Sequence, residues 1–500
     1  QGTQSVLSET DVIQPQQGSL WGLGRVIALE HPELKCRKVD LDAKLHFSET
    51  VSTLVEELLF SDDEDQIAYR QGQRYVARLR RWQPQIGEQT RTQLSIDSEA
   101  SYLITGGLGA LGLEVAQWLV YQGAKHLILT GRRVPSEAAM ETIQKLEQVG
   151  TQISVLSGDI SCEEDVAEIF EQIQASLFPL KGVIHGAGTL NDGLLQNVKW
   201  EPFLQVMASK VAGTWNLHKF TQHLSLDFFV CFSSMASLLG SPGQGNYAAA
   251  NAFMDAFAYY RRAMGLPGLS INWGPWDRGG MAARLGSQHQ NRFKSQGIGT
   301  IDSKKGLQAL GQVLAKPIAQ VGVASIQWPQ FLANSVAGID LQYLQIFRSE
   351  VQTTATQSNF LRQLEATPAQ ERRELLMGFV KKQISQVLGL DTPEAINNQD
   401  GFFDLGMDSL MAVELTNNFQ RIFQIYISQT VVFNYPTVEE IVDYLFYKVL
   451  NLEQQEEESE STYKVVDTDE KFSDFNTSLD SEEEIELSAA QELAEIKKFL

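Results

Sequence analysis

The sequence predicts an α/β protein whose largest domain is a Rossmann-like, doubly wound parallel sheet. From Ala100 onward, short apolar runs rich in β-branched and aromatic residues alternate with segments of helical periodicity, as in a parallel sheet with helices on both faces. The expected strands are SYLIT, HLILT, ISVLS, GVIHG, FFVCFSS, LSINW and GVASI. A glycine-rich run directly follows the first of them. We therefore assign residues 98–345 to one domain.

Residues 1–97 carry separate helix and strand cues. They include the helix-like run GSLWGLGRVIALEHPEL and the strand-like run QIAYRQGQRYVARL. This segment is too short to form a complete α/β domain with a core of its own. We expect it to be the C-terminal part of a companion subdomain whose first part precedes this chain.

Length, charge and cysteine usage restrict the function. With 500 residues the chain exceeds one ordinary core. A formal net charge of −22 disfavours binding to a phosphate backbone, so we expect no nucleic-acid partner. Cys36, Cys162 and Cys231 lack metal-ligand spacing and cannot form a disulfide framework, which predicts no metal site and a reducing compartment, by default the cytoplasm. No signal-peptide pattern and no bilayer-length apolar run is evident, so we expect no membrane association.

Beyond the α/β domain, linkers alternate with helical segments. Residues 346–367 contain SEVQTTATQSNF, a run without periodicity that is typical of a linker. Residues 368–450 predict a small all-helical domain, because the apolar positions of LLMGFVKKQISQVLGL recur at helical spacing. Residues 451–480 include EQQEEESESTY, an acidic run that predicts a disordered linker.

Residues 481–500 predict a final helix with one apolar face. Ser481 and Glu484 have the spacing of a capping box. The apolar face consists of Ile485, Ala489, Leu493, Ile496 and Leu500. One isolated helix cannot bury such a face, so we expect it to dock on a partner; a frayed amphipathic end is the alternative.

The glycine-rich run between the first strand and a helix predicts a dinucleotide site. Glycines let the backbone turn sharply and approach a pyrophosphate, whose charge is stabilised by free N–H groups at the helix N-terminus. The residues expected to bind the cofactor here are Thr105, Gly106, Gly107, Leu108, Gly109, Ala110 and Leu111. The second strand ends at Arg132 and Arg133, where an acidic residue would bind the ribose of NAD. Arginine can instead hold a 2′-phosphate, which predicts NADPH; two ordinary surface arginines are the alternative.

Two further strand ends are expected at the same site. Asp159 and Ile160 follow the third strand, and His185, Gly186, Ala187 and Gly188 follow the fourth. The carboxyl ends of parallel strands form the ligand-binding edge of such sheets. We therefore add these residues to the cofactor site, although turn chemistry alone would also account for each of them.

Four further motifs make the resemblance to a known family plain. They are HGAG, FSSMAS, YAAAN at Tyr247–Asn251, and INWGPW. With the glycine loop, they indicate that residues 1–345 resemble the ketoreductase domain of a modular type I polyketide synthase, a multifunctional enzyme of secondary metabolite biosynthesis. This domain is a member of the short-chain dehydrogenase/reductase superfamily. The resemblance implies an NADPH-dependent enzyme that reduces a β-ketoacyl thioester to a β-hydroxyacyl thioester.

The resemblance also assigns catalytic roles to four residues. Tyr247 would give its phenolic proton to the carbonyl oxygen, and Ser234 would hydrogen-bond that oxygen. Lys210 would ease proton loss from the phenol, whose ordinary pKa is about 10. Asn251 would hold the lysine and a proton-relay water. Most superfamily members carry the lysine four residues after the tyrosine, where this chain has Asn251; polyketide ketoreductases share the exchange with an earlier lysine.

The expected stereochemistry rests on the segment after HGAG. Leu190-Asn191-Asp192 stands where B-type ketoreductases carry Leu-Asp-Asp, so Asp192 matches the pattern and Asn191 departs from it. Other positions that fit the B-type pattern are Pro242, Asn246 and Leu239, the last standing where A-type enzymes carry tryptophan. The resemblance thus implies a B-type enzyme, with Asp192 in stereocontrol and a D-configured (3R) β-hydroxyl product.

Residues 368–450 resemble an acyl carrier protein, which is a four-helix bundle. The run GMDSL at Gly406–Leu410 stands at a helix start and matches the attachment site of 4′-phosphopantetheine, which implies Ser409 as the attachment residue. A simple helix-capping serine is the alternative, although Asp408 could provide the cap instead. The acidic linker and the final helix resemble the docking segments through which one polyketide synthase polypeptide passes its chain to the next.

The resemblance further implies a set of partners. They are the carrier-tethered substrate, upstream ketosynthase and acyltransferase domains, a downstream polyketide synthase polypeptide and, in the full synthase, a second copy in a homodimer. Three other interpretations stay open at this point: a fatty acid synthase fragment, a catalytically silent carrier and scaffold segment, and a reductase of free small metabolites. No thioesterase signature follows the carrier, which favours transfer of the chain onward.

Overall fold

The structure of the chain is a computed structural model that covers most of the domains expected from the sequence. The described residues are 1–7, 13–60, 62–82, 96–278, 293–333, 342–348, 357–390, 392–393, 396–423, 425, 427–428 and 430–452. The predicted acidic linker and docking helix, residues 453–500, therefore lie outside the described residues. Of the described helices, none is long and apolar enough to cross a membrane. The described His, Cys, Asp and Glu side chains form no group that could hold a metal ion.

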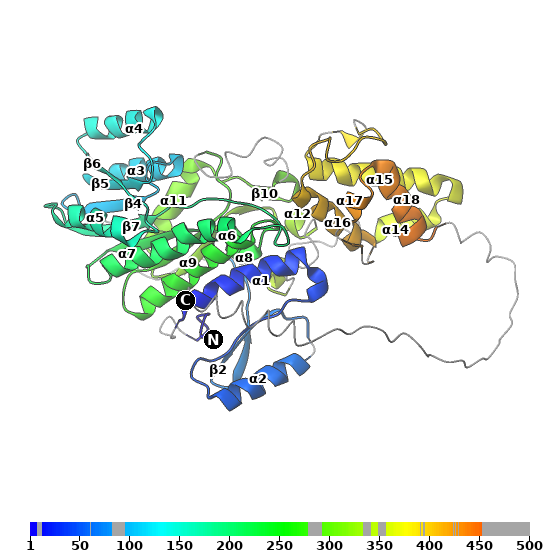
Figure 1. Cartoon of the computed structure of the whole chain (residues 1–500), viewed down its shortest axis with the longest axis horizontal. Helices are drawn as coiled ribbons and strands as arrows, with labels where there is room; N and C mark the ends of the chain where they lie inside the picture. Colours follow the sequence, from blue (N-terminus) through cyan, green and yellow to red (C-terminus); the bar gives the residue numbers. More distant parts are fainter. Residues whose placement is uncertain are drawn as a thin grey trace, which may run out of the picture. The chain divides into compact units, whose positions relative to one another are not determined.

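The main sheet has seven parallel strands, which confirms the predicted fold class (Figure 1). The strands are β4 (Ser101–Thr105), β5 (His126–Gly131), β6 (Gln152–Ser157), β7 (Leu180–His185), β8 (Phe228–Ser234), β9 (Leu269–Trp273) and β11 (Gln320–Val323). Their spatial order is β11-β9-β8-β7-β4-β5-β6. The chain thus winds outward from β4 in both directions. The carboxyl ends of β4 and β7 form the switch point at which such sheets bind ligands.

Helices cover both faces of this sheet, because alternate residues of a strand point to opposite sides. In β4, Tyr102 and Ile104 lie in one core. The helices that contribute to this core are α3 (Ala110–Tyr121), α4 (Glu137–Gln148) and α11 (Ser303–Leu314). Leu103 lies in the opposite core. The helices on that side are α5 (Glu163–Gln174), α7 (Gly213–Thr221) and α9 (Gly245–Ala263).

The expectation that GVASI is a single strand is wrong. Its first residues end β11, whereas Ser325–Ile326 form β12, which pairs antiparallel with β10 (Ile298–Gly299). The cause is the length of the neighbouring strand, since β9 ends at Trp273, opposite Val323. Beyond Trp273 there is no β9 residue with which the chain could pair. The backbone N–H and C=O groups of Ser325 and Ile326 therefore form their hydrogen bonds with β10 instead. Two short helices follow, α12 (Trp328–Ala333) and α13 (Gln345–Arg348).

The described residues before Ser101 form a subdomain around a three-stranded sheet. β1 (Lys38–Asp40) pairs in parallel with β2 (Gln66–Arg70), which pairs antiparallel with β3 (Gln73–Val76). The strand-like run QIAYRQGQRYVARL is thus a hairpin. Its turn residues, Gln71 and Gly72, have φ values of 54° and 74°, as in the type I′ turn that suits the twist of a hairpin. The helices of this subdomain are α1 (Gly18–Glu30) and α2 (Phe47–Leu59), with short 3₁₀ turns at Pro15–Gln17 and Pro32–Leu34.

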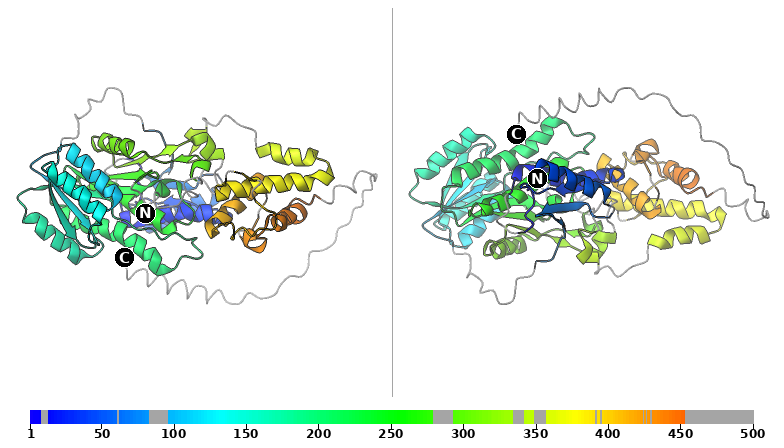
Figure 2. Two further views of the ribbon diagram at one scale, coloured as in Figure 1. Left: turned by 90° about the horizontal axis from the view of Figure 1, so that it is seen from above. Right: turned by 90° about the horizontal axis from the view of Figure 1, so that it is seen from below.

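Helix α1 packs along α9 of the main domain (Figure 2). The two helices approach closely because glycine faces alanine. A Cβ atom added at Gly22 would lie 2.2 Å from the carbonyl oxygen of Ala248, and one at Gly18 would lie 2.8 Å from the Cβ atom of Ala256. Gly18 and Gly22 are one helical turn apart and therefore share a face. The N-terminal segment is thus part of the scaffold that positions α9.

The described residues from 357 to 452 form helices around another core. The helices are α14 (Gln357–Ala366), α15 (Ala369–Leu388), α16 (Ser409–Phe423), α17 (Val431–Asn434) and α18 (Val438–Asp443), followed by a π-helical turn at Tyr444–Val449. The predicted linker 346–367 is wrong at its C-terminal end, because α14 lies within it. Leu364 is buried in the core, and Phe360 and Leu361 pack against it. These residues share one helical face, but the polar run before them hides this periodicity.

We expect Gly22→Ala to destabilise the chain, because the new methyl group would overlap the carbonyl of Ala248. The free energy of unfolding should fall by about 1–3 kcal/mol, despite a gain in helix propensity of about 1 kcal/mol. Gly24→Ala in the same helix is the matched control, since its Cβ atom would contact side-chain atoms of Lys38 and Cys36 rather than backbone. Urea unfolding followed by tryptophan fluorescence measures both variants. Equal stabilities would contradict the role of glycine in this contact.

Candidate active site

The glycine loop between β4 and α3 lies against the segment that follows β7. Gly106 has a φ of +68°, and a Cβ atom there would lie 3.0 Å from the backbone of Ala187. A Cβ atom at Gly112, in the first turn of α3, would lie 2.4 Å from the carbonyl oxygen of Gly106. The glycines therefore allow the loop to fold tightly beneath the N-terminus of α3. This end of the helix presents backbone N–H groups at the carboxyl edge of the sheet, where a pyrophosphate would bind.

His185 supports the glycine loop from inside the fold. Its Nδ1 atom lies 2.7 Å from the Oγ1 atom of Thr105, and the N–H of Gly186 donates to the Thr105 carbonyl at 3.1 Å. The imidazole is completely buried. Burial, with a smaller effect from the charge of Lys210, lowers its pKa to about 3, so the ring is neutral at ordinary pH.

The predicted adenosine end of the site has a charged pair. Arg132 and Arg133 are exposed just beyond β5, and an Nη1 atom of Arg132 lies 3.5 Å from Asp159 Oδ2. Although partial burial raises the pKa of Asp159, two hydrogen bonds from Ser161 and the charge of Arg132 bring it below its usual value. Ile160 is buried beside this pair, and its carbonyl accepts a hydrogen bond from an asparagine of α7.

The structure brings together the four residues predicted to be catalytic. Ser234 ends β8 and caps α8 (Met235–Leu239). Tyr247 lies in the first turn of α9 and interacts with the hydroxyl of Ser234. Asn251 lies one turn further on, and its Nδ2 atom donates to the Tyr247 carbonyl at 2.8 Å. Lys210 Nζ lies 5.4 Å from the centroid of the Tyr247 ring.

Lys210 and Tyr247 have opposite pKa shifts with one cause. Lys210 lies in a π-helical turn, Ala208–Ala212, between α6 (Trp200–Met207) and α7, and its Nζ atom donates to the Phe232 carbonyl at 3.0 Å. Burial lowers the pKa of Lys210 to about 8. Burial also raises the pKa of Tyr247 to about 12, while hydrogen bonds with Ser234 and Asn251 act in the other direction. The site thus places a phenol and a buried ammonium group close together, and a nearby positive charge favours the deprotonated form of a phenol.

Known proteins are similar to this chain in sequence and fold. Residues 100–278 match the family model of the KR domain, and residues 379–445 match that of a phosphopantetheine attachment site. A solved A1-type ketoreductase is 32% identical over 70% of this chain and 73% of its own, with a TM-score of 0.63. The first ketoreductase of the tylosin polyketide synthase is 31% identical over 70% of this chain and 74% of its own, with a TM-score of 0.60. This chain belongs to the ketoreductase family of modular polyketide synthases.

The curated relatives of this ketoreductase are much longer proteins. Polyketide synthase GfsA of Streptomyces halstedii is 33% identical over 449 residues, which are 87% of this chain but 6% of GfsA. Phenolphthiocerol synthesis polyketide synthase type I Pks15/1 of Mycobacterium marinum is 35% identical over 360 residues, 17% of its length. The chain thus spans a small part of these relatives. Its ketoreductase domain is of the NADPH-dependent kind, and its attachment domain is of the kind that carries 4′-phosphopantetheine.

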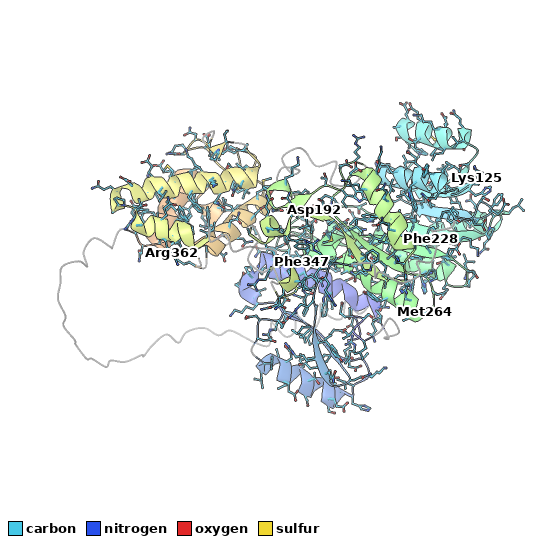
Figure 3. All side chains as sticks on the ribbon, turned by 180° about the vertical axis from the view of Figure 1, so that it is seen from behind. Lys125, Asp192, Phe228, Met264, Phe347 and Arg362 are labelled. Atoms are coloured by element: carbon cyan, nitrogen blue, oxygen red, sulfur yellow. The ribbon has the colours of Figure 1, made fainter. Side chains whose placement is uncertain are left out.

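In this ketoreductase, the predicted stereocontrol segment, residues 190–192, forms hydrogen bonds with residues at the start of α9. Asn246 Nδ2 donates to the backbone carbonyl of Asn191 at 2.8 Å, and Gln244 Nε2 donates to the carboxylate of Asp192 at 2.9 Å. Asp192, labelled in Figure 3, is exposed. Because Asn191 makes its contact through the backbone, asparagine in place of aspartate leaves this contact unchanged.

In the carrier domain, Ser409 is the first residue of α16. Asp408 caps this helix, since its Oδ1 atom accepts a hydrogen bond from the N–H of Met411 at 2.7 Å. Gly406, in the preceding turn, has a φ of +94°, a conformation that favours glycine. Asp408 thus serves as the N-cap of α16.

A buried polar cluster that the sequence motifs do not predict lies beneath Ser234. Asp255 of α9 accepts hydrogen bonds from the hydroxyls of Ser237 and Ser270, both at 2.6 Å, and from Asn272 Nδ2 at 2.8 Å. Asn272 also donates to the Ser234 carbonyl at 3.3 Å. Burial raises the pKa of Asp255. The cluster connects α9 with the ends of β8 and β9. A single carboxylate in an alanine-rich helix was the only cue to it in the sequence.

We expect Lys210→Met to stabilise the fold while it removes the charge beside Tyr247. Folding lowers the pKa of Lys210 from 10.5 to about 8, so holding this lysine protonated in the folded state costs about 1–3 kcal/mol near neutral pH. This cost is complete below pH 8 and vanishes above pH 10.5. The gain in the free energy of unfolding should therefore be largest at neutral pH and disappear at high pH.

Equilibrium unfolding of Lys210→Met across this pH range checks the expectation. Lys219→Met, at an exposed position of α7, is the control and should change stability little at any pH. A Lys210→Met variant that is less stable than the wild type near neutral pH would contradict the expected cost of the buried charge.

Proposed function

We propose that this chain reduces a β-ketoacyl thioester to a β-hydroxyacyl thioester with NADPH, while the acyl chain is attached to phosphopantetheine on Ser409, during polyketide chain extension. The observation that carries the proposal is the arrangement of Lys210, Ser234, Tyr247 and Asn251 at the carboxyl edge of the sheet. Carbonyl reduction needs a proton donor, a hydroxyl that binds the carbonyl oxygen and a nearby positive charge. The four side chains supply these groups.

The chemistry divides between cofactor and protein. NADPH, when bound, supplies the hydride that adds to the carbonyl carbon. Tyr247 gives its proton to the carbonyl oxygen, and Ser234 donates a hydrogen bond to the same oxygen. A phenol with a pKa of about 12 is a poor acid at neutral pH, so the charge of Lys210 must stabilise the resulting phenolate. Asn251 Oδ1 is buried and has no hydrogen-bond partner among the described residues, which suits it to accept from the water that returns the proton.

The residues at the cofactor site fit a dinucleotide with a 2′-phosphate. The glycine loop keeps side chains away from the N-terminus of α3, where the pyrophosphate would bind. Arg132 and Arg133 stand where the adenosine ribose would lie. Within the described part of the chain, the ion pair with Asp159 involves one Nη atom of Arg132, which leaves other guanidinium N–H groups for a phosphate. This arrangement supports NADPH over NADH.

The proposed enzyme is B-type and makes the D-configured hydroxyl. Support comes from Asp192 and from the other matching positions, Pro242, Asn246 and Leu239. Solved structures similar to this chain include an A1-type ketoreductase and other A-type ketoreductases, so similarity of fold does not decide the type. The hydrogen bond from Asn246 to the Asn191 backbone holds the segment against the catalytic helix without using the side chain that departs from the pattern.

The proposed organisation joins reductase and carrier in one polypeptide. A flexible tether raises the effective concentration of a substrate to about the millimolar range without any new contact. Residues 98–345 would form the catalytic domain, completed by residues 1–97, and the carrier would begin with α14 rather than at residue 368. We further propose upstream ketosynthase and acyltransferase domains, a downstream synthase polypeptide that binds residues 481–500, and a homodimeric, cytoplasmic synthase.

Oxidation of NADPH with a synthetic β-ketoacyl thioester tests the reductase directly. Tyr247→Phe should lower kcat by about 10²–10⁴-fold because it removes the proton donor, and it should leave NADPH affinity unchanged. Tyr260→Phe, later in the same helix, is the matched control. Chiral chromatography of the product should show the D-hydroxyl. If the wild type fails to oxidise NADPH, a silent scaffold replaces our proposal, and a dominant L-hydroxyl would overturn the B-type assignment alone.

Mass spectrometry tests the carrier separately. Treatment with a phosphopantetheinyl transferase and coenzyme A should add one phosphopantetheine to the wild type. Ser409→Ala should abolish this addition because no hydroxyl remains at the start of α16. Ser428→Ala, at another serine of the same domain, should still be loaded. Loading of Ser409→Ala would place the attachment site elsewhere.

A further inference from the structure

A carboxylate of the N-terminal subdomain reaches the active site. Glu30 is the last residue of α1, and 3% of its surface is exposed. Its Oε1 atom accepts a hydrogen bond from the N–H of Gly243 at 2.7 Å, and its Oε2 atom accepts one from the N–H of Leu195 at 2.8 Å. Each oxygen of one carboxylate thus binds a different backbone segment.

Both segments border Tyr247. The first, residues 190–195, contains the predicted stereocontrol residue Asp192, and the second, residues 241–244, leads directly into α9. They also bind each other, since the N–H of Gly193 donates to the Gly243 carbonyl at 2.7 Å and Gln244 donates to Asp192 at 2.9 Å. Glu30 therefore joins two chain segments, neither of which is a β-strand. The relative position of these segments determines where Asp192 lies with respect to Tyr247.

The support beneath Glu30 is rigid. Helix α1 contacts α9 at backbone distance through Gly22, so it has little freedom to shift. Arg25, on the same helix, donates a hydrogen bond to the carbonyl of Ser237 in α8. A Cβ atom at Gly240 would lie 2.6 Å from Leu29. The last two turns of α1 are thus packed against the segments that surround the active site.

The location of Glu30 is unfavourable for a carboxylate on local grounds. Burial raises its pKa, with the two backbone hydrogen bonds acting against this effect. The C-terminal end of a helix carries a partial negative charge, which also disfavours a carboxylate there. Local stability therefore does not account for an acidic residue at this position. The two long-range hydrogen bonds from Gly243 and Leu195 to the Glu30 carboxylate account for it.

We propose that Glu30 is a positioning residue for the reduction, which holds residues 190–195 and 241–244 together so that the keto group is presented to Tyr247 by one face. Glu30 itself touches neither substrate nor cofactor. Its loss should therefore affect turnover and stereochemical purity and leave NADPH binding unchanged. This inference rests on the proposed function, because it assumes that the described site carries out a ketone reduction.

The test compares Glu30→Gln with Glu33→Gln. Glutamine keeps the size of glutamate, but its NH₂ group cannot accept a hydrogen bond, so either Gly243 or Leu195 loses its partner. Glu33 is exposed and pairs with its neighbour His31, which makes Glu33→Gln the matched control. For Glu30→Gln we expect kcat with a β-ketoacyl thioester to fall by between about 10- and 100-fold. We also expect the minor alcohol enantiomer to rise and the Kd of NADPH to stay at the wild-type value.

Hydrogen exchange measured by mass spectrometry gives a readout that is independent of turnover. Peptides that cover residues 190–196 and 241–246 should exchange faster in Glu30→Gln than in the wild type or the control, while peptides of β4 and α3 should be unchanged. If Glu30→Gln does not fold, Glu30→Asp tests the same point, because it keeps the charge and shortens the reach by one methylene group.

The outcomes separate the inference from the proposed function. If the wild type reduces the substrate and Glu30→Gln has the same kcat and enantiomer ratio, the inference is wrong. Unchanged exchange in both segments would also overturn it. If the wild type does not reduce the substrate, the proposed function fails on its own, and the exchange result alone decides whether Glu30 holds the two segments.

Discussion

The active site depends on the position of one helix, α9. This helix carries Tyr247 and Asn251. Its side chains Phe253 and Phe257 are buried in the core between α9 and the sheet. On the opposite side, the glycines of α1 bring a second helix to backbone distance. Contacts of this kind leave no side-chain freedom to absorb a shift, since protein interiors are packed at nearly crystalline density. Packing on two sides of α9 therefore fixes the position of Tyr247 independently of its polar contacts.

Buried charge is the second constraint on the site. Lys210, Asp255 and Glu30 are all buried, and burial shifts the pKa of each away from its ordinary value. Burying such groups works against folding unless hydrogen bonds compensate for the lost water. Each of these residues has such hydrogen bonds, and each connects α9 or its surroundings to another element. The same low-dielectric setting that makes these groups costly strengthens the field of Lys210 at the phenol.

The parts that the sequence predicted well are those with local signals. The central strands of the main sheet, such as β4 and β9, are buried on both faces, so they read as continuous apolar runs. The glycine loop and the YAAAN motif mark the site directly. The division between β11 and β12 has no local signal, because it depends on where β9 ends, some fifty residues earlier. Helix α14 was missed because its apolar face follows a polar run. Glu30 reaches partners 165 and 213 residues away, and no spacing pattern in the sequence reports a contact of that range.

Helix α1 has a consequence for the exchange of reductases between assembly lines. The family match begins at residue 100, which invites the view that a transferable enzyme starts there. A chimaera joined at that point would combine a foreign α9 with an α1 whose glycines and terminal carboxylate fit the α9 of this chain and the segment that leads into it. A junction upstream of Gly18 keeps both halves of the contact in one inherited unit. The steric fit between α1 and α9 thus places the useful junction for recombination before Gly18, well before residue 100, where the family match begins.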